Sequence, residues 1–230
     1  MNQNKGKLIV IEGVDGSGKE TQAVRLYDRL KAEGKEIMEV SYPRYDKDSS
    51  AMVRQYLAGD FGSKPEDVSP YVASTFYAAD RYASYKEDYE DFLRDGGIVL
   101  ADRYTTSNMV HQAGKLKDDD ERKAFLKWLY DYEFNLLGLP VPDLIFFLDI
   151  PPEVSQKLMA HRANKITGEA KKDIHESDPE YLKQSYYNAR ALADDYGWTV
   201  IHCVEDGKLR SIESIHEEIY QVVEEALKEN

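Results

Sequence analysis

The chain has 230 residues, of which 42% are hydrophobic and 32% charged, a balance typical of a folded globular domain. Its 43 acidic residues exceed its 30 lysines and arginines, and the net charge of −13 disfavours binding to nucleic acids and anionic membranes. The single cysteine, Cys203, excludes an internal disulfide and a cysteine-rich metal site. No apolar run is long enough for a signal peptide or a membrane span, so we expect one cytoplasmic domain over residues 1–230.

Short apolar runs alternate with longer helical patterns along the chain. The apolar runs predict strands at 7–12, 36–41, 98–101, 143–150 and 198–204. The helical patterns predict helices around 19–33, 49–58, 69–94, 105–114, 119–137, 152–162, 178–195 and 211–228. Continuous apolar strands separated by helices indicate a mainly parallel sheet that helices cover on both faces. We therefore predict a three-layer α/β fold with a five-stranded sheet.

The segment Gly13-Val14-Asp15-Gly16-Ser17-Gly18-Lys19 directly follows the first predicted strand and opens the first predicted helix. This is the Gly-x-x-x-x-Gly-Lys phosphate loop in the setting that it requires. The loop's N–H groups and the helix N-terminus attract a phosphate, and Lys19 reaches the β- and γ-phosphates. The residues that we expect to bind a nucleotide are Gly13, Asp15, Gly16, Ser17, Gly18, Lys19, Glu20 and Thr21.

Two carboxylates are candidate Mg²⁺ ligands. Glu20 follows the loop lysine, where Ser or Thr normally ligates the metal, and a carboxylate is also a competent ligand. Asp102 ends the apolar run 98–101, where a phosphate-loop protein needs a carboxylate for the water shell of the metal. Arg103 then stands at the mouth of the site. Without the loop, an ordinary surface ion pair would explain the Asp-Arg sequence equally well.

Together these segments resemble thymidylate kinases, which phosphorylate dTMP with ATP. The matching segments, in family order, are IEGVDGSGKETQ at 11–22, SYPRYD at 41–46, FYAADR at 76–81, ADRYTTSN at 101–108, HQAG at 111–114 and LDIPPEV at 148–154. The resemblance covers nearly the whole chain. It implies a P-loop NTPase-type fold, ATP and Mg²⁺ as cofactors, and typically a homodimer.

The resemblance implies roles for two residues of the predicted helix 69–94. Tyr77 stacks on the thymine ring and Arg81 donates to a base carbonyl; their spacing of four places them on one helix face. A core-facing stripe on another side of this helix is predicted from Val72, Phe76, Ala79 and Ala83. Without the other motifs, a surface aromatic beside a surface arginine would be the simpler interpretation.

The resemblance also implies how the acceptor is held. Arg44 and Arg103 contact its phosphate, while Asp15 accepts from the 3′-hydroxyl and orients Arg103. The residues expected against the base and sugar are Asn108, His111 and Gln112. His111 stands where the family commonly has tyrosine, a ring that helps to exclude a 2′-hydroxyl, so discrimination against ribonucleotides is a place where this chain can differ.

Residues 161–179 are highly charged and carry no apolar stripe, which fits either a solvated loop or a mobile lid. Some relatives carry a catalytic arginine where this chain has Gly16, so the resemblance favours a lid that supplies the positive charge. The candidate cations are Arg162, Lys165, Lys171 and Lys172, of which only Arg162 has a clear family counterpart. The expected catalytic residues are Lys19, Asp15, Arg103 and Arg162, and Arg162 is also expected to bind the nucleotide.

The leading hypothesis is therefore a dTMP kinase that takes dTMP and ATP as small-molecule substrates. A sibling deoxynucleoside or nucleotide kinase with another acceptor is a first alternative, supported by Tyr77, His111 and Glu20. A phosphate-loop nucleotide switch is a second, although a switch would not need FYAADR and Asn108 in one pocket. A nucleic-acid-binding module is disfavoured by the net charge of −13.

Overall fold

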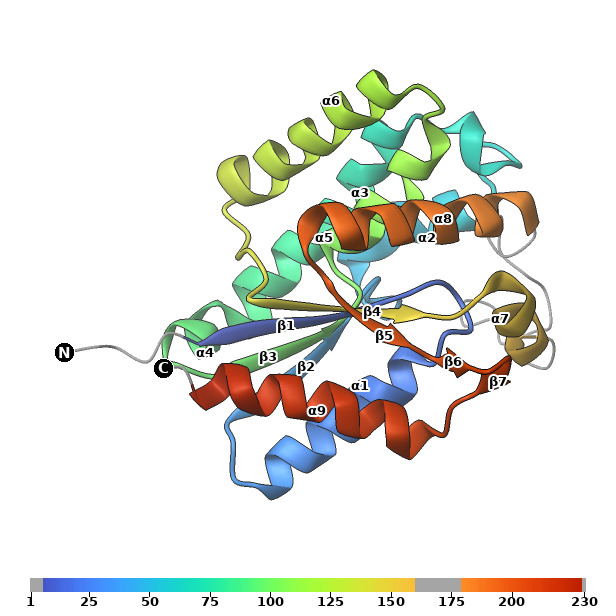
Figure 1. The fold of residues 1–230 in the computed structure, drawn as a ribbon. Helices are drawn as coiled ribbons and strands as arrows, with labels where there is room; N and C mark the ends of the chain where they lie inside the picture. Colours follow the sequence, from blue (N-terminus) through green and yellow to red (C-terminus); the bar gives the residue numbers. More distant parts are fainter. Residues whose placement is uncertain (1–5, 160–178, 229–230) are drawn as a thin grey trace.

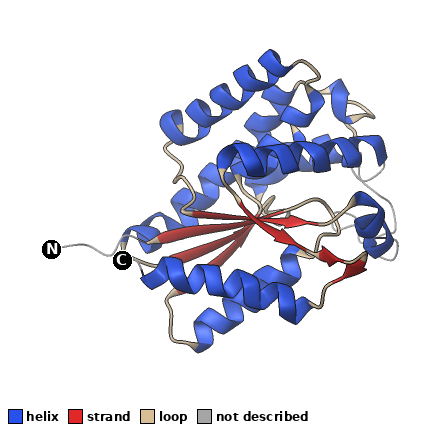
Figure 2. Ribbon diagram, viewed as in Figure 1, coloured by secondary structure: helices blue, strands red, loops and turns tan. Residues whose placement is uncertain are grey.

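The computed structural model describes residues 6–159 and 179–228, and a five-stranded sheet lies at its centre (Figures 1 and 2). The strands are β1 (Lys7–Glu12), β2 (Ile37–Ser41), β3 (Ile98–Asp102), β4 (Leu144–Asp149) and β5 (Thr199–His202). Their order is β2-β3-β1-β4-β5, and every neighbouring pair is parallel. The predicted five-stranded parallel sheet is therefore confirmed.

Helices cover both faces of this sheet, as Figure 1 shows. One face packs against α1 (Lys19–Ala32) and α9 (Ile212–Lys228). The other helices are α2 (Ala51–Ala58), α3 (Pro70–Ser84), α4 (Glu90–Arg94), α5 (Thr105–His111), α6 (Asp119–Tyr130), α7 (Pro152–Met159) and α8 (Pro179–Tyr196). Successive side chains of β1 enter different clusters, Ile9 with Leu26 of α1 and Val10 with Tyr89. Burial on both sides explains why this strand reads as an unbroken apolar run.

Two helical patterns contain π-helical turns that the sequence did not predict. The pattern 69–94 is α3, the turn η3 (Tyr85–Tyr89) and α4, and the pattern 119–137 is α6 followed by the turn η5 (Asp131–Leu136). Shorter 3₁₀ turns are η1 (Asp48–Ser50), η2 (Pro65–Asp67) and η4 (Ala113–Lys115). The last predicted strand ends early, and a short hairpin of β6 (Val204–Glu205) and β7 (Lys208–Leu209) follows it.

The stripe predicted to face the core from α3 was wrong at two of its positions, although Phe76 packs against a buried cluster that includes Val53 and Tyr56. Val72 is 47% exposed and Ala79 is exposed, whereas polar side chains of the same helix are buried. The buried residues of α3 are Ala73, Ser74, Ala78, Asp80, Arg81 and Ser84. Compared with the prediction, α3 is turned about its axis, because polar residues such as Asp80 and Arg81 have partners inside the protein. The apolar pattern alone does not reveal these partners.

The carboxyl ends of β1 and β3 lie side by side, since Ile11 stands opposite Asp102 in the sheet register. In open parallel sheets this edge is where ligands bind. None of the described helices is both long and apolar enough to cross a membrane. The predicted lid, except its last residue Pro179 at the start of α8, lies outside the described residues.

Candidate active site

The predicted phosphate loop joins β1 to α1 at this edge of the sheet. Gly16 and Gly18 have φ angles of 78° and 87°, which glycine adopts without strain. Lys19 begins α1, is 7% exposed, and donates from Nζ to the Val14 carbonyl oxygen at 3.0 Å. Burial, and then the nearby Arg103 guanidinium, lower the pKa of Lys19 to about 8. The Ser17 hydroxyl is buried without a hydrogen-bond partner in the described part of the chain, as expected for a loop that wraps a phosphate.

Arg103 lies at the centre of the site, directly after β3. Its φ of 68° is rare for a residue with a side chain, and such strain often marks functional positions. The guanidinium forms an ion pair with Asp15 of the phosphate loop and lies 3.8 Å from Glu12. It also donates to His111 Nε2 at 3.3 Å. The structure thus brings Asp15, Arg103 and His111 together, as the sequence predicts.

Burial and neighbouring charges oppose each other at Arg103 but act in the same direction at His111. Burial lowers the pKa of Arg103, but Asp15 and then Glu12 raise it by more, so its pKa lies above the ordinary value. Burial, and then Arg103, lower the pKa of His111 to about 3, so the imidazole is neutral. Because Arg103 donates to Nε2, the ring proton of His111 resides on Nδ1.

Asp102 fits a metal site at the end of β3. It is 6% exposed, and its Oδ1 is buried without a hydrogen-bond partner among the described residues. Glu20 and Thr21 lie exposed in the first turn of α1. Burial, and then the charge of Asp102, raise the pKa of Glu39 on β2, and Glu20 contributes as well. Although the described residues hold no cluster of three metal-binding side chains, Mg²⁺ on a nucleotide needs only one or two carboxylates.

Arg81 is buried in a second network. Its Nε and Nη2 donate to the two oxygens of Glu133 on η5, at 2.8 and 2.5 Å. Thr105 and Asn108, both on α5, also donate to Glu133, at 2.6 and 3.2 Å. Arg81 and Asn108 are thus brought together as predicted, through a carboxylate that the sequence analysis did not single out.

Tyr77 lies one turn before Arg81 on α3. It is half-buried and packs edge-on against Tyr56, with ring centroids 6.4 Å apart. Gln112, after α5, is 1% exposed, and its Oε1 has no hydrogen-bond partner within the described segments. A buried amide oxygen without a donor fits a residue that receives a ligand hydrogen bond.

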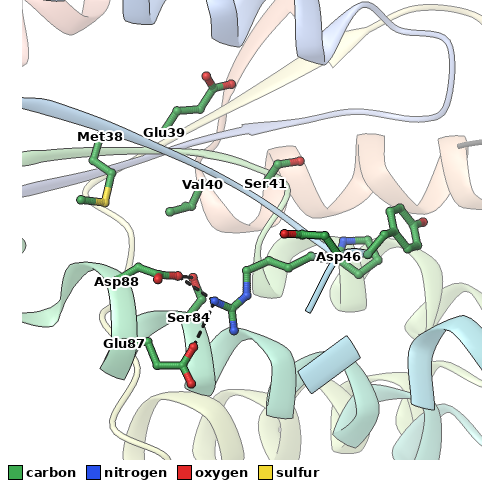
Figure 3. Close-up of a pocket in the computed structure, with 11 residues that line it drawn as sticks. Met38, Glu39, Val40, Ser41, Asp46, Ser84, Glu87 and Asp88 are labelled. Atoms are coloured by element: carbon green, nitrogen blue, oxygen red, sulfur yellow. Dashed lines mark hydrogen bonds and ion pairs between the residues drawn. The ribbon is translucent and has the colours of Figure 1, made fainter. Parts of the chain in front are cut away.

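Arg44 lines an open cavity of about 810 Å³ beside β2. Figure 3 shows Glu87 and Asp88 in this cavity, while Glu39 points away from them across the strand. The Arg44 guanidinium binds Asp80 at 3.2 Å and Asp88 at 2.7 Å. The described ion pairs of Arg44 are with Asp80, Glu87 and Asp88, whereas those of Arg103 are with Glu12 and Asp15, so the two arginines predicted to share a phosphate have separate partners among the described residues.

Sequence reasoning missed two buried carboxylates that hold the predicted residues. Glu12 accepts from Thr106 at 2.7 Å, from Ser107 at 2.6 Å and from the Gly13 N–H at 2.8 Å. A carboxylate at the end of an otherwise apolar strand is a signal that could have identified Glu12. Glu133 gives no comparable signal, because it is one of three polar residues, with Asp131 and Asn135, that alternate with aromatic residues in a helical pattern. Arg162, Lys165, Lys171 and Lys172 lie outside the described residues.

Comparisons with known proteins agree on one family. The family model described as thymidylate kinase matches residues 11–226. The chain is 32% identical over 207 residues to the thymidylate kinase of Mycobacterium tuberculosis (strain ATCC 25618 / H37Rv), covering 88% of this chain and 94% of the relative. It is 30% identical over 230 residues to the thymidylate kinase of Halothermothrix orenii, covering 97% and 99%. A solved thymidylate kinase structure from Candida albicans shares the fold, with a TM-score of 0.71 and 20% identity over 98% of this chain and 94% of that chain.

Proposed function

The chain belongs to the thymidylate kinase family, and we propose that it transfers the γ-phosphate of ATP to dTMP, giving ADP and dTDP. The observation that carries this proposal is the meeting of Lys19 with the Asp15–Arg103 pair at the carboxyl ends of β1 and β3. This arrangement puts a buried lysine and a partly buried arginine at the end of the phosphate loop. Phosphoryl transfer requires that charge and little further chemistry from the protein.

In this proposal catalysis is positioning and electrostatic stabilisation. The attacking phosphate oxygen is already anionic, so no general base is needed. Lys19 and Arg103 neutralise charge on the phosphates, and Asp15 keeps Arg103 oriented. Arg162, which lies outside the described residues, completes the catalytic set from a lid over ATP.

The acceptor would lie between Arg103 and the network around Arg81. We assign Arg81 and Asn108 to the base edge, Tyr77 to its face, and His111 and Gln112 to the base and sugar. Arg44 would reach the acceptor phosphate by exchanging its partly exposed ion pairs with Glu87 and Asp88, while Asp80 keeps its hold on Nε.

Mg²⁺ would be held by Asp102, with Glu20 as a direct or water-mediated ligand. The buried, unpartnered Oδ1 of Asp102 in the described structure supports the first assignment. When bound, the ion neutralises charge on the β- and γ-phosphates. Asp102 would hold the ion from the buried end of β3.

The test is ADP release with a panel of nucleoside monophosphates. We expect dTMP to give the highest kcat/KM and to be phosphorylated to dTDP. A higher value with another monophosphate would support the sibling kinase, which the departures at Tyr77, His111 and Glu20 favour. ATP hydrolysis that no monophosphate stimulates would support the nucleotide switch instead.

We also propose that residues 1–230 form one domain and that two copies form a homodimer. The family model spans residues 11–226 without a break, which supports the single domain. Exposed apolar side chains on α3 support the dimer. The proposed substrates are cytoplasmic nucleotides, so we place the protein in the same compartment.

A further inference from the structure

Glu133 is the common acceptor of a buried network beside the proposed base site. Its carboxylate is 0% exposed and accepts from Arg81, Thr105 and Asn108 at distances between 2.5 and 3.2 Å. An ionised carboxylate accepts hydrogen bonds and donates none. Arg81, Thr105 and Asn108 must therefore each direct a donor towards Glu133. This determines which donor or acceptor Arg81 and Asn108 have left for a ligand.

Asn108 has its amide orientation fixed by two acceptors. Its Nδ2 donates to Glu133 Oε1 at 3.2 Å and to the Ser74 carbonyl oxygen at 3.3 Å, which uses both N–H groups. Turning the amide over would place Oδ1 against two other acceptors in a buried site, where Asn108 is 2% exposed. The group that Asn108 has left for a ligand is consequently Oδ1, which is an acceptor.

Arg81 is fixed as a donor by the same carboxylate. Burial lowers its pKa, but Glu133 raises it by more, so the guanidinium stays charged. The described bonds to Glu133 occupy Nε and Nη2 and leave the Nη1 hydrogens outside the pair. A guanidinium has no acceptor, so Arg81 can only donate to a ligand.

We propose that Glu133 is a positioning residue that selects the acceptor base, by presenting a donor at Arg81 beside an acceptor at Asn108. The inference rests on the proposed function, which places these two residues at the base edge. A base with a ring carbonyl next to a ring N–H matches this pair, as thymine and uracil do. Cytosine presents an amine next to an unprotonated ring nitrogen, so both contacts would be mismatched.

The variant Glu133→Gln tests this polarity because glutamine has nearly the same size but can also donate. The Asn108 amide then keeps only the Ser74 carbonyl oxygen as an obligatory acceptor, so its orientation is less firmly fixed, and Arg81 loses one of its acceptors. We expect the ratio of kcat/KM for dTMP to that for dCMP to fall about tenfold or more, with little change in KM for ATP. Glu133→Asp only accepts, so it should keep the ratio even where both rates fall.

The matched control is Glu217→Gln, the same carboxylate-to-amide change in an exposed ion pair with Arg29. It should leave both rates and their ratio unchanged. Equal losses for dTMP and dCMP in Glu133→Gln would show that Glu133 is merely structural. The wild-type rate with dTMP tests the proposed function separately, so an unchanged ratio overturns only the role of Glu133.

A second comparison is independent of the folding of Glu133→Gln, which leaves the buried Arg81 guanidinium without its counter-charge. Arg81→Met is compared with the double variant Arg81→Met and Glu133→Gln, which has no charge at either position. Arg81→Met should keep part of the preference for dTMP through Asn108, and the double variant should lose it. Equal ratios in the two variants would overturn the proposal.

Discussion

At the scale of single residues, His111 shows how burial decides the chemistry of a position. An exposed histidine changes its charge near neutral pH, but burial and the Arg103 guanidinium lower the pKa of His111 to about 3. In the unfolded chain the pKa of His111 is about 6.5, so between pH 3 and pH 6.5 the unfolded chain binds a proton that the folded chain does not. Stability should therefore rise as pH rises from about 3 to 6.5, and acid should destabilise the protein.

We predict that His111→Gln removes part of this acid sensitivity. Between pH 7 and pH 5 the wild type should lose about 2 kcal/mol of unfolding free energy through His111, since only the unfolded state takes up the proton. Urea unfolding of both proteins at several pH values measures the difference. Identical pH dependence in the two proteins would mean that His111 is charged in the folded state.

We predict that Asp102 and Glu20 contribute unequally to the binding of Mg²⁺. Asp102→Asn removes a charge from a buried oxygen that has no partner within the described residues, so the Mg²⁺ concentration for half-maximal rate should rise about tenfold or more. Glu20→Ala, at an exposed position, should raise it less, and Glu20→Ser should restore it in part. Titrations of the rate with Mg²⁺ at saturating ATP and dTMP measure both effects. If Glu20→Ala changes nothing, then phosphates, water and Asp102 hold the ion without Glu20.

At the scale of elements, the first turn of α5 ties two parts of the site together. Four consecutive side chains donate to two buried carboxylates. Thr105 and Asn108 bind Glu133, and the two residues between them bind Glu12, as the hydrogen bonds of Thr106 and Ser107 show. One helical turn therefore holds the end of β1, through Glu12, and the proposed base site, through Glu133, in a fixed relative position. We call this set of four hydrogen bonds the α5 frame.

We predict that Thr106→Val weakens this frame. The change keeps the shape of the side chain but removes the 2.7 Å hydrogen bond to Glu12, so the unfolding free energy should fall by about 1–3 kcal/mol. Because Arg103 lies 3.8 Å from Glu12, kcat should fall as well. Thr75→Val, the same change at an exposed hydroxyl of α3, should stay within about 0.5 kcal/mol. Equal effects of the two variants in urea unfolding and turnover would contradict the frame.

The sequence predicted the elements that a local pattern encodes. The five strands were found because apolar runs buried on both faces are visible without knowing their neighbours, and the phosphate loop was found because its glycines and Lys19 are adjacent in the chain. The turn η5 and its Glu133 were not, because a single extra residue in a helix leaves the apolar spacing nearly unchanged. Similarly, the pairing of Arg44 with Asp88 joins residues far apart in the chain.

At the scale of the whole molecule, α3 leaves apolar side chains exposed on one face, and such a face is a candidate for contact with another chain. Val72, Ala79 and Tyr82 recur at helical spacing, and Val72 and Tyr82 are 47% and 39% exposed. In a two-fold symmetric dimer, this face of one copy would pack against the same face of the other copy, so both would be buried. The net charge of −13 on each copy opposes association, so apolar contact rather than charge attraction must hold such a dimer.

We predict that Val72→Asp dissociates the proposed homodimer. Two-fold symmetry places the new carboxylate on both sides of the interface, so each dimer would gain two charges on a buried apolar face. The dimer dissociation constant should rise at least about tenfold, and salt should strengthen the wild-type dimer by screening the net charge. Sedimentation velocity over a range of concentrations measures both effects. The control is Val24→Asp on α1, where the valine is 44% exposed on another helix, and it should leave the dimer intact. A wild type that stays monomeric, or equal dissociation by both variants, would show that α3 does not form the interface.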